Sequence, residues 1–221
     1  MIPRRRNRGL LAGPEARILD VLVAHVPGKV GPDMLSLLGL LGAVMGSAGF
    51  AMALASEISL AMVVVGFGLN WLGDSLDGRV ARHRGIERRI QGFVLDNGLD
   101  LVAYLLLAVG FALSGLVSLP VPFLLLALYT LLSNLALARL MITGVHDLAI
   151  DVVGTTELRV LFVALAVLLF LLPEVFAYVI PLIELSVLDF LSLFWACVML
   201  FHFFAVLRRD LRQAARADAG D

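Results

Sequence analysis

Residues 101–138 have the sequence LVAYLLLAVGFALSGLVSLPVPFLLLALYTLLSNLALA, without one charged side chain between Asp100 and Arg139. This stretch is too long for a single membrane-spanning helix, which needs about 20 apolar residues. Pro120 and Pro122 stand near its middle, where proline's missing N–H and fixed ring favour a break. The stretch therefore predicts two consecutive membrane spans joined by a turn.

The rest of the composition agrees with a membrane protein. Of the 221 residues, 61% are hydrophobic, and the mean hydropathy is +0.98. Such values are typical of polytopic membrane proteins and not of soluble domains. We expect an all-α fold in one compact membrane domain. Its six transmembrane helices are expected at Met34–Leu54, Ile58–Gly78, Gly92–Ser114, Val121–Ile142, Leu158–Val179 and Val187–Leu207.

The lysine and arginine residues lie on one side of this arrangement. Six precede the first expected span, five lie between the second and third, Arg139 and Arg159 flank the loop between the fourth and fifth, and four follow the sixth, which accounts for all 17. The opposite loops, residues 55–57, 115–120 and 174–184, carry none. Because these residues collect in cytoplasmic loops, both termini are expected in the cytoplasm, in an integral protein of the cell membrane. The net charge of −1 gives no indication of a nucleic-acid partner.

An amphipathic segment precedes the first span. In residues 14–26, Ile18, Leu19, Leu22 and Val26 recur at helical spacing with charged residues between them. We expect a helix lying in the membrane interface. The basic leader of this helix, Arg4, Arg5, Arg6 and Arg8, is not followed by the apolar region and cleavage site of a signal peptide. The expected organisation is a cytoplasmic N-terminus with this interfacial helix at 1–33, the six-helix domain at 34–207 and a basic cytoplasmic tail at 208–221.

Small residues form a stripe along the first span. They are spaced three or four residues apart, at Gly39, Gly42, Gly46 and Gly49. Such a stripe permits close contact between helices. It serves either packing within one chain or a surface for a second copy.

Four carboxylates interrupt the apolar sequence at the second and third spans. They belong to two runs, Asp74-x-x-Asp77-Gly78-x-x-Ala81-Arg82 and, nine residues later, Gly92-x-x-x-Asp96-x-x-x-Asp100. These spacings put each run on one face of a helix, so that oxygen atoms converge from two helices. Bare carboxylates that close repel one another, whereas a hard divalent cation, above all magnesium bound to substrate phosphates, stabilises them. The two runs predict a metal and phosphate site at the cytoplasmic face.

The complete pattern, D-x2-D-G-x2-A-R-x9-G-x3-D-x3-D, resembles the signature of the CDP-alcohol phosphotransferase family, and all eight fixed positions are filled. The resemblance implies transfer of a substituted phosphate from a CDP-linked donor to an alcohol, with release of CMP. It implies Mg²⁺ or Mn²⁺ as cofactor, as two ions, and a homodimer. Among the donors we favour CDP-diacylglycerol, which would make the protein a phosphatidyltransferase of phospholipid biosynthesis that acts among membrane lipids.

The resemblance also implies a role for each fixed residue. The metal ligands would be Asp74, Asp77, Asp96 and Asp100, with Asp100 also the catalytic base that takes the proton from the attacking hydroxyl. The residues that bind CDP would be Asp74, Asp77, Gly78, Ala81, Arg82 and Gly92. The residue types suit these roles, because glycine and alanine leave room for a diphosphate and the guanidinium of arginine presents paired donors to phosphate.

Two further basic residues, Arg139 and Arg159, have two interpretations. They either bind a phosphorylated acceptor or only anchor their loop on the cytoplasmic side. The acceptor itself is open, since glycerol phosphate, inositol phosphate, serine and choline all fit the same metal centre. CDP-choline or CDP-ethanolamine is an alternative donor.

A different class of protein, a cation-binding transporter, also places carboxylates within the membrane. Transporters commonly contain two repeated halves with paired broken helices, whereas the acidic runs occur here in one place only. A membrane scaffold without activity would have no need of the complete motif. The sequence therefore favours an enzyme.

Overall fold

The computed structural model describes residues 4–5, 11–53, 58–143, 145–146, 155–180 and 184–219. Parts of the expected basic leader and the loop at 55–57 lie outside this description. The described helices are α1 (Ala12–His25), α2 (Pro32–Ala51), α3 (Ile58–His83), α4 (Arg89–Leu113), α5 (Pro120–Thr143), α6 (Thr155–Leu171), α7 (Pro173–Ala177) and α8 (Val187–Ala219). Two-residue strands form a parallel pair, β1 (Arg4–Arg5) with β2 (Val145–His146), and an antiparallel pair, β3 (Val179–Ile180) with β4 (Leu185–Ser186).

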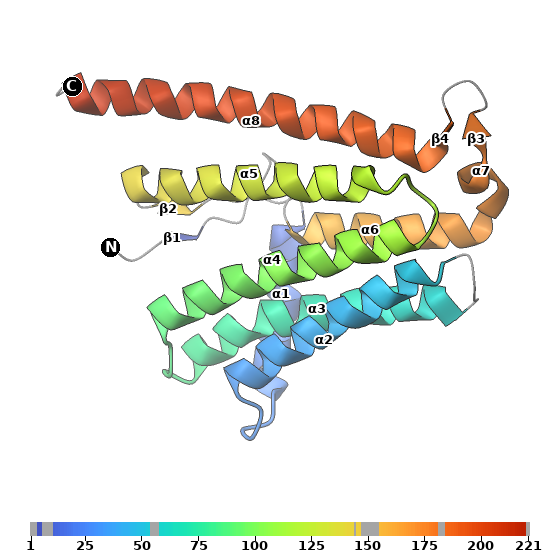
Figure 1. Cartoon of the computed structure of the whole chain (residues 1–221). Helices are drawn as coiled ribbons and strands as arrows, with labels where there is room; N and C mark the ends of the chain where they lie inside the picture. The colour runs from blue at the N-terminus through green and yellow to red at the C-terminus, as the bar shows by residue number, and fades with distance from the viewer. Residues whose placement is uncertain are drawn as a thin grey trace.

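Five of the described helices, α2, α3, α4, α5 and α8, are long and apolar enough to cross a membrane. The expected all-α polytopic fold is thereby confirmed. The turn between α3 and α4 lies at the same end of the helix bundle as the C-terminal end of α8 (Figure 1). This common end carries the basic residues that predict a cytoplasmic side.

The fifth expected span, Leu158–Val179, differs from the helix that the structure contains. α6 has 17 residues and ends at Leu171, and the short helix α7 starts anew at Pro173. Proline cannot donate a helical hydrogen bond and disfavours the helical conformation in the residue before it. Because α6 is not among the described helices that meet the length for a span, the count of six spans stays a prediction.

α2 and α3 pack closely because glycines on both helices face the backbone of the partner. Gly39, Gly42, Gly46 and Gly49 are all buried. A β-carbon on Gly42 would collide with backbone atoms of α3, and one on Gly66 or Gly73 would collide with backbone atoms of α2. Of the two uses predicted for the glycine stripe, the structure shows packing within one chain.

An aromatic cluster joins α6 to the α2–α3–α4 unit. Phe50 is fully buried and stacks on Phe111 with ring centroids 4.3 Å apart. Phe162 of α6 packs against both rings and stacks on Phe67 at 5.7 Å. Burial of these large rings stabilises the contact, and it holds the first turns of α6, with Arg159, beside α3.

The amphipathic segment forms α1, which runs crosswise to the long helices (Figure 1). Its buried side chains Leu19 and Val23 pack against Leu76 and Val80 of α3. Ile18 and Val21 are more than half exposed on its outer side. Arg17 and Asp20 are exposed as well, so the outer side is mixed in polarity. The position of α1 in the membrane interface stays a prediction.

α8 begins with a reciprocal pair of hydrogen bonds. The backbone N–H of Ser186 donates to the carboxylate of Asp189, and the backbone N–H of Asp189 donates to Ser186 Oγ, both at 3.0 Å. Asp189 is 2% exposed and also accepts hydrogen bonds from the backbone N–H and the hydroxyl of Ser118. One buried carboxylate therefore caps α8 and ties it to the loop between α4 and α5. At its other end α8 continues to Ala219, so the expected tail is helical as far as it is described.

We expect Asp189→Ala to lower the free energy of unfolding by about 1–3 kcal/mol, because the donors of Ser118 and Ser186 lose their buried acceptor. Thermal unfolding of the protein in detergent, followed by circular dichroism, measures the change. Glu174→Ala, which removes an exposed carboxylate from α7, is the matched control. Equal stability of the two variants would show that this cap contributes nothing.

Candidate active site

The four aspartates of the two acidic runs line one small cavity. Asp74 and Asp77 come from α3, and Asp96 and Asp100 come from α4. With α2 contributing Ser36, Gly39 and Leu40, they enclose about 20 Å³; we call this the acidic cavity. The local cause is helical spacing, which puts each pair on one face. The convergence of the two faces results from the tight pairing of both helices with α2.

A larger cavity of about 470 Å³ lies next to the acidic cavity and shares Ser36, Asp77 and Asp96 with it. We call it the entrance cavity. Its other lining residues include the remaining fixed positions of the motif, Gly78, Ala81, Arg82 and Gly92. The structure thus brings the expected CDP-binding residues to two adjoining cavities, with Asp74 in the acidic one.

The two glycines of the motif leave space in the entrance cavity for different reasons. At Gly92 a β-carbon would meet no atom within 4 Å, so the backbone is open to a bound molecule. At Gly78 a β-carbon would lie 3.3 Å from Nη1 of Arg82. Glycine there gives the Arg82 guanidinium room above the helix backbone, where its donors can bind phosphate.

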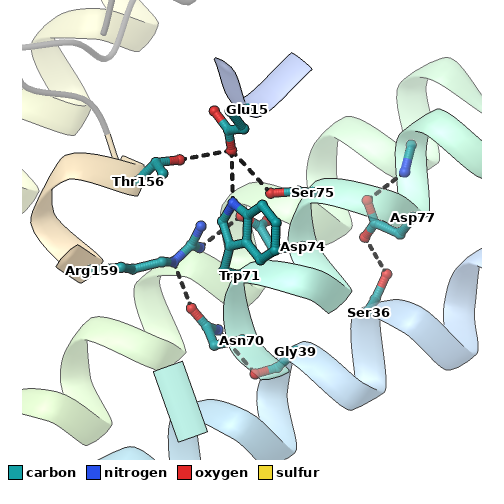
Figure 2. Close-up of polar contacts among 11 residues, drawn as sticks. Glu15, Ser36, Gly39, Asn70, Trp71, Asp74, Ser75, Asp77, Thr156 and Arg159 are labelled. Atoms are coloured by element: carbon teal, nitrogen blue, oxygen red, sulfur yellow. Dashed lines mark hydrogen bonds and ion pairs between the residues drawn. The ribbon is translucent and has the colours of Figure 1, made fainter. Parts of the chain in front are cut away.

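Asp74 and Asp77 are each bound to a polar side chain of another helix (Figure 2). Ser36 Oγ donates to Asp77 at 2.6 Å. Arg159 Nη2 donates to Asp74 Oδ2 at 2.7 Å, and Arg159 Nε donates to Asn70 Oδ1 at 2.8 Å. Asn70 in turn donates to the carbonyl oxygen of Gly39 at 2.9 Å. These contacts join α2, α3 and α6 around the acidic cavity.

The donor chemistry of the acidic cavity fits a hard divalent ion, because carboxylate oxygens are the ligands that Mg²⁺ and Mn²⁺ prefer. Across the part of the chain that the structure describes, however, no three His, Cys, Asp or Glu side chains form a group that could hold a metal ion as they stand.

The two arginines expected at the acceptor lie in different places. Arg159 contacts the motif through Asp74 and also lines a third small cavity with Asn70, Asp100, Tyr104 and Phe162; we call this the inner cavity. Arg139, at the end of α5, instead makes a two-pronged ion pair with Asp210 of α8, with both nitrogen–oxygen distances 3.0 Å. The structure therefore brings Arg159, and not Arg139, to the aspartates. Acceptor binding by either residue stays a prediction.

Several residues of the site are difficult to find from the sequence. Asn70 shares a helical stripe with Asp74, and this spacing is its one local signal. Ser36 carries no signal, because a serine in an apolar helix is common. Glu15 belongs to the expected interfacial helix, far from the motif in the sequence, yet it contacts residues that flank Asp74.

Glu15 joins three helices next to the Asp74–Arg159 pair (Figure 2). Its Oε1 accepts hydrogen bonds from Trp71 Nε1 at 2.9 Å, from Ser75 Oγ at 3.4 Å and from Thr156 Oγ1 at 2.8 Å. Trp71 and Ser75 flank Asp74 on α3, and Thr156 lies one turn before Arg159 on α6. The carboxylate of Glu15 therefore holds both elements that carry the ion pair.

We expect Glu15→Ala to loosen α1 and the start of α6, because three donors lose a shared acceptor. In a Trp195→Phe background, which leaves Trp71 as the remaining tryptophan, the emission of Trp71 should shift to longer wavelength and the melting temperature should fall. Asp20→Ala, which removes the exposed ion pair of the same helix with Arg79, should leave the emission unchanged. Identical spectra for both variants would contradict this role of Glu15.

Comparison with known proteins adds one positive finding. A family model described as CDP-alcohol phosphatidyltransferase matches residues 29–206. The match includes both acidic runs and extends from the connector before α2 into α8. A search of curated proteins found no matching sequence.

Proposed function

The chain belongs to the CDP-alcohol phosphatidyltransferase family, whose members transfer a phosphate-linked group from a CDP-alcohol to an acceptor, and from this premise we propose a specific reaction. The protein transfers the phosphatidyl group of CDP-diacylglycerol to a polar alcohol and releases CMP, as a step of phospholipid biosynthesis. One observation carries the proposal: all eight motif residues line two adjoining cavities, the acidic cavity and the entrance cavity.

The position of the cavities suits substrates of mixed polarity. The entrance cavity has polar walls from Asp33, Arg82 and Arg88. An apolar cavity of about 140 Å³ between α4, α5, α6 and α8 adjoins the inner cavity, and both are lined by Tyr104 and Phe162. A nucleotide at the polar end and a lipid-linked group toward the apolar interior would both find matching surroundings.

In the proposed reaction the hydroxyl oxygen of the acceptor forms a bond to the phosphorus that carries diacylglycerol. The bond from this phosphorus to the bridging oxygen breaks, and CMP leaves with that oxygen. Asp100 takes the proton of the hydroxyl at its carboxylate. Its place supports this role, because Asp100 lines both the acidic cavity and the inner cavity. A base within reach of the attacking hydroxyl typically contributes 10²- to 10⁴-fold, roughly, to the rate.

The family generally uses divalent metal ions, and we assign Mg²⁺ or Mn²⁺ to Asp74, Asp77, Asp96 and Asp100 as two ions. When bound, such ions offset the negative charge of the diphosphate. Arg82 binds phosphate from the entrance cavity, and Gly78 and Gly92 let the nucleotide approach the helix backbones. Arg159 lines the inner cavity together with Asp100, and this position beside the proposed base supports a role in binding a phosphorylated acceptor.

We place the protein in the cell membrane with both termini and the entrance cavity on the cytoplasmic side, and we expect a homodimer. The distribution of lysine and arginine supports this orientation. In this orientation the lipid donor enters the site from the membrane leaflet, and the polar acceptor enters it from the cytoplasm.

The test is an assay of CMP release by the purified protein with Mg²⁺, CDP-diacylglycerol and a panel of alcohols, with CDP-choline plus diacylglycerol as the alternative pair. Release of CMP that requires one alcohol and CDP-diacylglycerol would support the proposal. Release of CMP from the pair of CDP-choline and diacylglycerol, but not from CDP-diacylglycerol, would show that the donor is CDP-choline. No metal-dependent release with any pair would overturn the proposed reaction.

A further inference from the structure

Arg159 provides the acidic cavity with a positive charge of its own. The guanidinium bonds to Asp74 at 2.7 Å, and the two side chains are 11% and 25% exposed, respectively. Its second bond, to Asn70, fixes the plane of the guanidinium against α3 (Figure 2). An ion pair so shielded from water is stronger than one at an open surface.

The need for such a charge follows from the cavity itself. Four carboxylates line a space of about 20 Å³, and their mutual repulsion opposes the close approach of α3 and α4 unless a cation compensates it. Arg159, bonded to Asp74, supplies part of this compensation. A bound divalent ion would supply the same compensation with twice the charge.

From these contacts we propose that Arg159 and the divalent ion compete for Asp74. Arg159 holds Asp74 in the metal-free state, entry of the ion displaces the guanidinium, and the displaced guanidinium then serves as a cation for an anionic substrate group. The inference rests on the proposed function, because it takes Asp74 as a metal ligand.

The geometry gives the displaced side chain a place to go. Arg159 already lines the inner cavity together with Asp100 and Tyr104. The backbone of α6 does not need to move, because Thr156, one turn earlier, is bonded to Glu15, and Phe162, one turn later, lies in the aromatic cluster. Only the flexible arginine side chain changes partner, and it stays beside the proposed base.

Competition makes a clear prediction about metal affinity. In Arg159→Gln the ion no longer displaces a cation or feels its repulsion, so Mn²⁺ should bind at least about tenfold more tightly, which is about 1.4 kcal/mol. The measurement is a titration with Mn²⁺ alone, followed by the electron paramagnetic resonance signal of free Mn²⁺, on the purified protein without nucleotide. Arg139→Gln is the matched control, because it also removes one arginine from an ion pair with an aspartate, on α5 and α8; its affinity should equal that of the wild type.

The outcomes separate this inference from the proposed function. If the wild type binds Mn²⁺ at a saturable site and Arg159→Gln binds it no more tightly, the competition is wrong while the metal site stands. If neither protein shows a saturable site, the metal site fails and the competition with it. Should Arg159→Gln not fold, Arg159→Lys is the second variant, because lysine keeps the charge but cannot bond to both Asn70 and Asp74 in the same way. An affinity of Arg159→Lys for Mn²⁺ between those expected for the wild type and for Arg159→Gln supports the proposal. An affinity equal to that of the wild type overturns it.

Discussion

Replacement of Asp100 by asparagine is expected to lower the rate of CMP release by about 10²- to 10⁴-fold, because the amide cannot accept the proton of the attacking hydroxyl. Asparagine has nearly the same shape as aspartate, so the helix and the two cavities that Asp100 lines should persist. The measurement is turnover at saturating donor and acceptor, together with binding of the CDP-linked donor and a circular dichroism spectrum. Binding and spectrum should stay close to those of the wild type.

The control for this variant is Asp20→Asn, the same chemical change in an exposed ion pair of α1 with Arg79. It should have nearly normal turnover. Near-normal turnover of Asp100→Asn would remove the assignment of Asp100 as the base. Loss of donor binding along with turnover would show that Asp100 acts through binding of the metal ions or the donor and not as the base.

Replacement of Gly42 by alanine is expected to disrupt the pairing of α2 with α3. The added β-carbon would lie 2.5 Å from the carbonyl oxygen of Gly66 and 2.9 Å from the carbonyl carbon of Leu69, both backbone atoms that cannot rotate away. Overpacking of a closed contact costs about 1–3 kcal/mol and occasionally more. Because the helices must separate, Asn70 and Asp74 on α3 should also move, and we expect loss of both thermal stability and CMP release.

Gly68→Ala on α3 is the matched control, since a β-carbon there would meet no atom within 4 Å. Alanine favours a helix over glycine by about 1 kcal/mol, so this variant should be at least as stable as the wild type. Melting temperatures in detergent measure both effects. A melting temperature of Gly42→Ala equal to that of Gly68→Ala would show that the close helix contact does not exist.

Much of the helical framework could be predicted because its signals are local. The charge-free residues 101–138, interrupted by Pro120, predict two spans, and the structure has α4 and α5 with a turn before Pro120. The expected span Leu158–Val179 was wrong at its end, because Pro173 breaks the helix after Leu171. Apolar composition alone did not reveal this break, since the residues on both sides of the proline are apolar.

The candidate site was likewise predictable only in part. The spacing in Asp74-x-x-Asp77 and Asp96-x-x-x-Asp100 suffices to predict two acidic helix faces, and the order of the motif suffices for the family. The partners of these carboxylates were not predictable. Arg159 lies 85 residues from Asp74 in the sequence, and Arg139 has a similar local sequence signal, yet it pairs with Asp210.

Helix periodicity, hydropathy and the position of prolines depend on neighbours within a few turns, so the bare sequence was enough for the membrane class, most helices and the identity of the acidic motif. The three-dimensional packing was needed to learn that α1 reaches the site through Glu15, that α2 closes it through Ser36, and that Arg159 is the cation at Asp74. Those contacts join segments far apart in the chain, and the close approach of helix backbones and the burial of side chains between them select each partner.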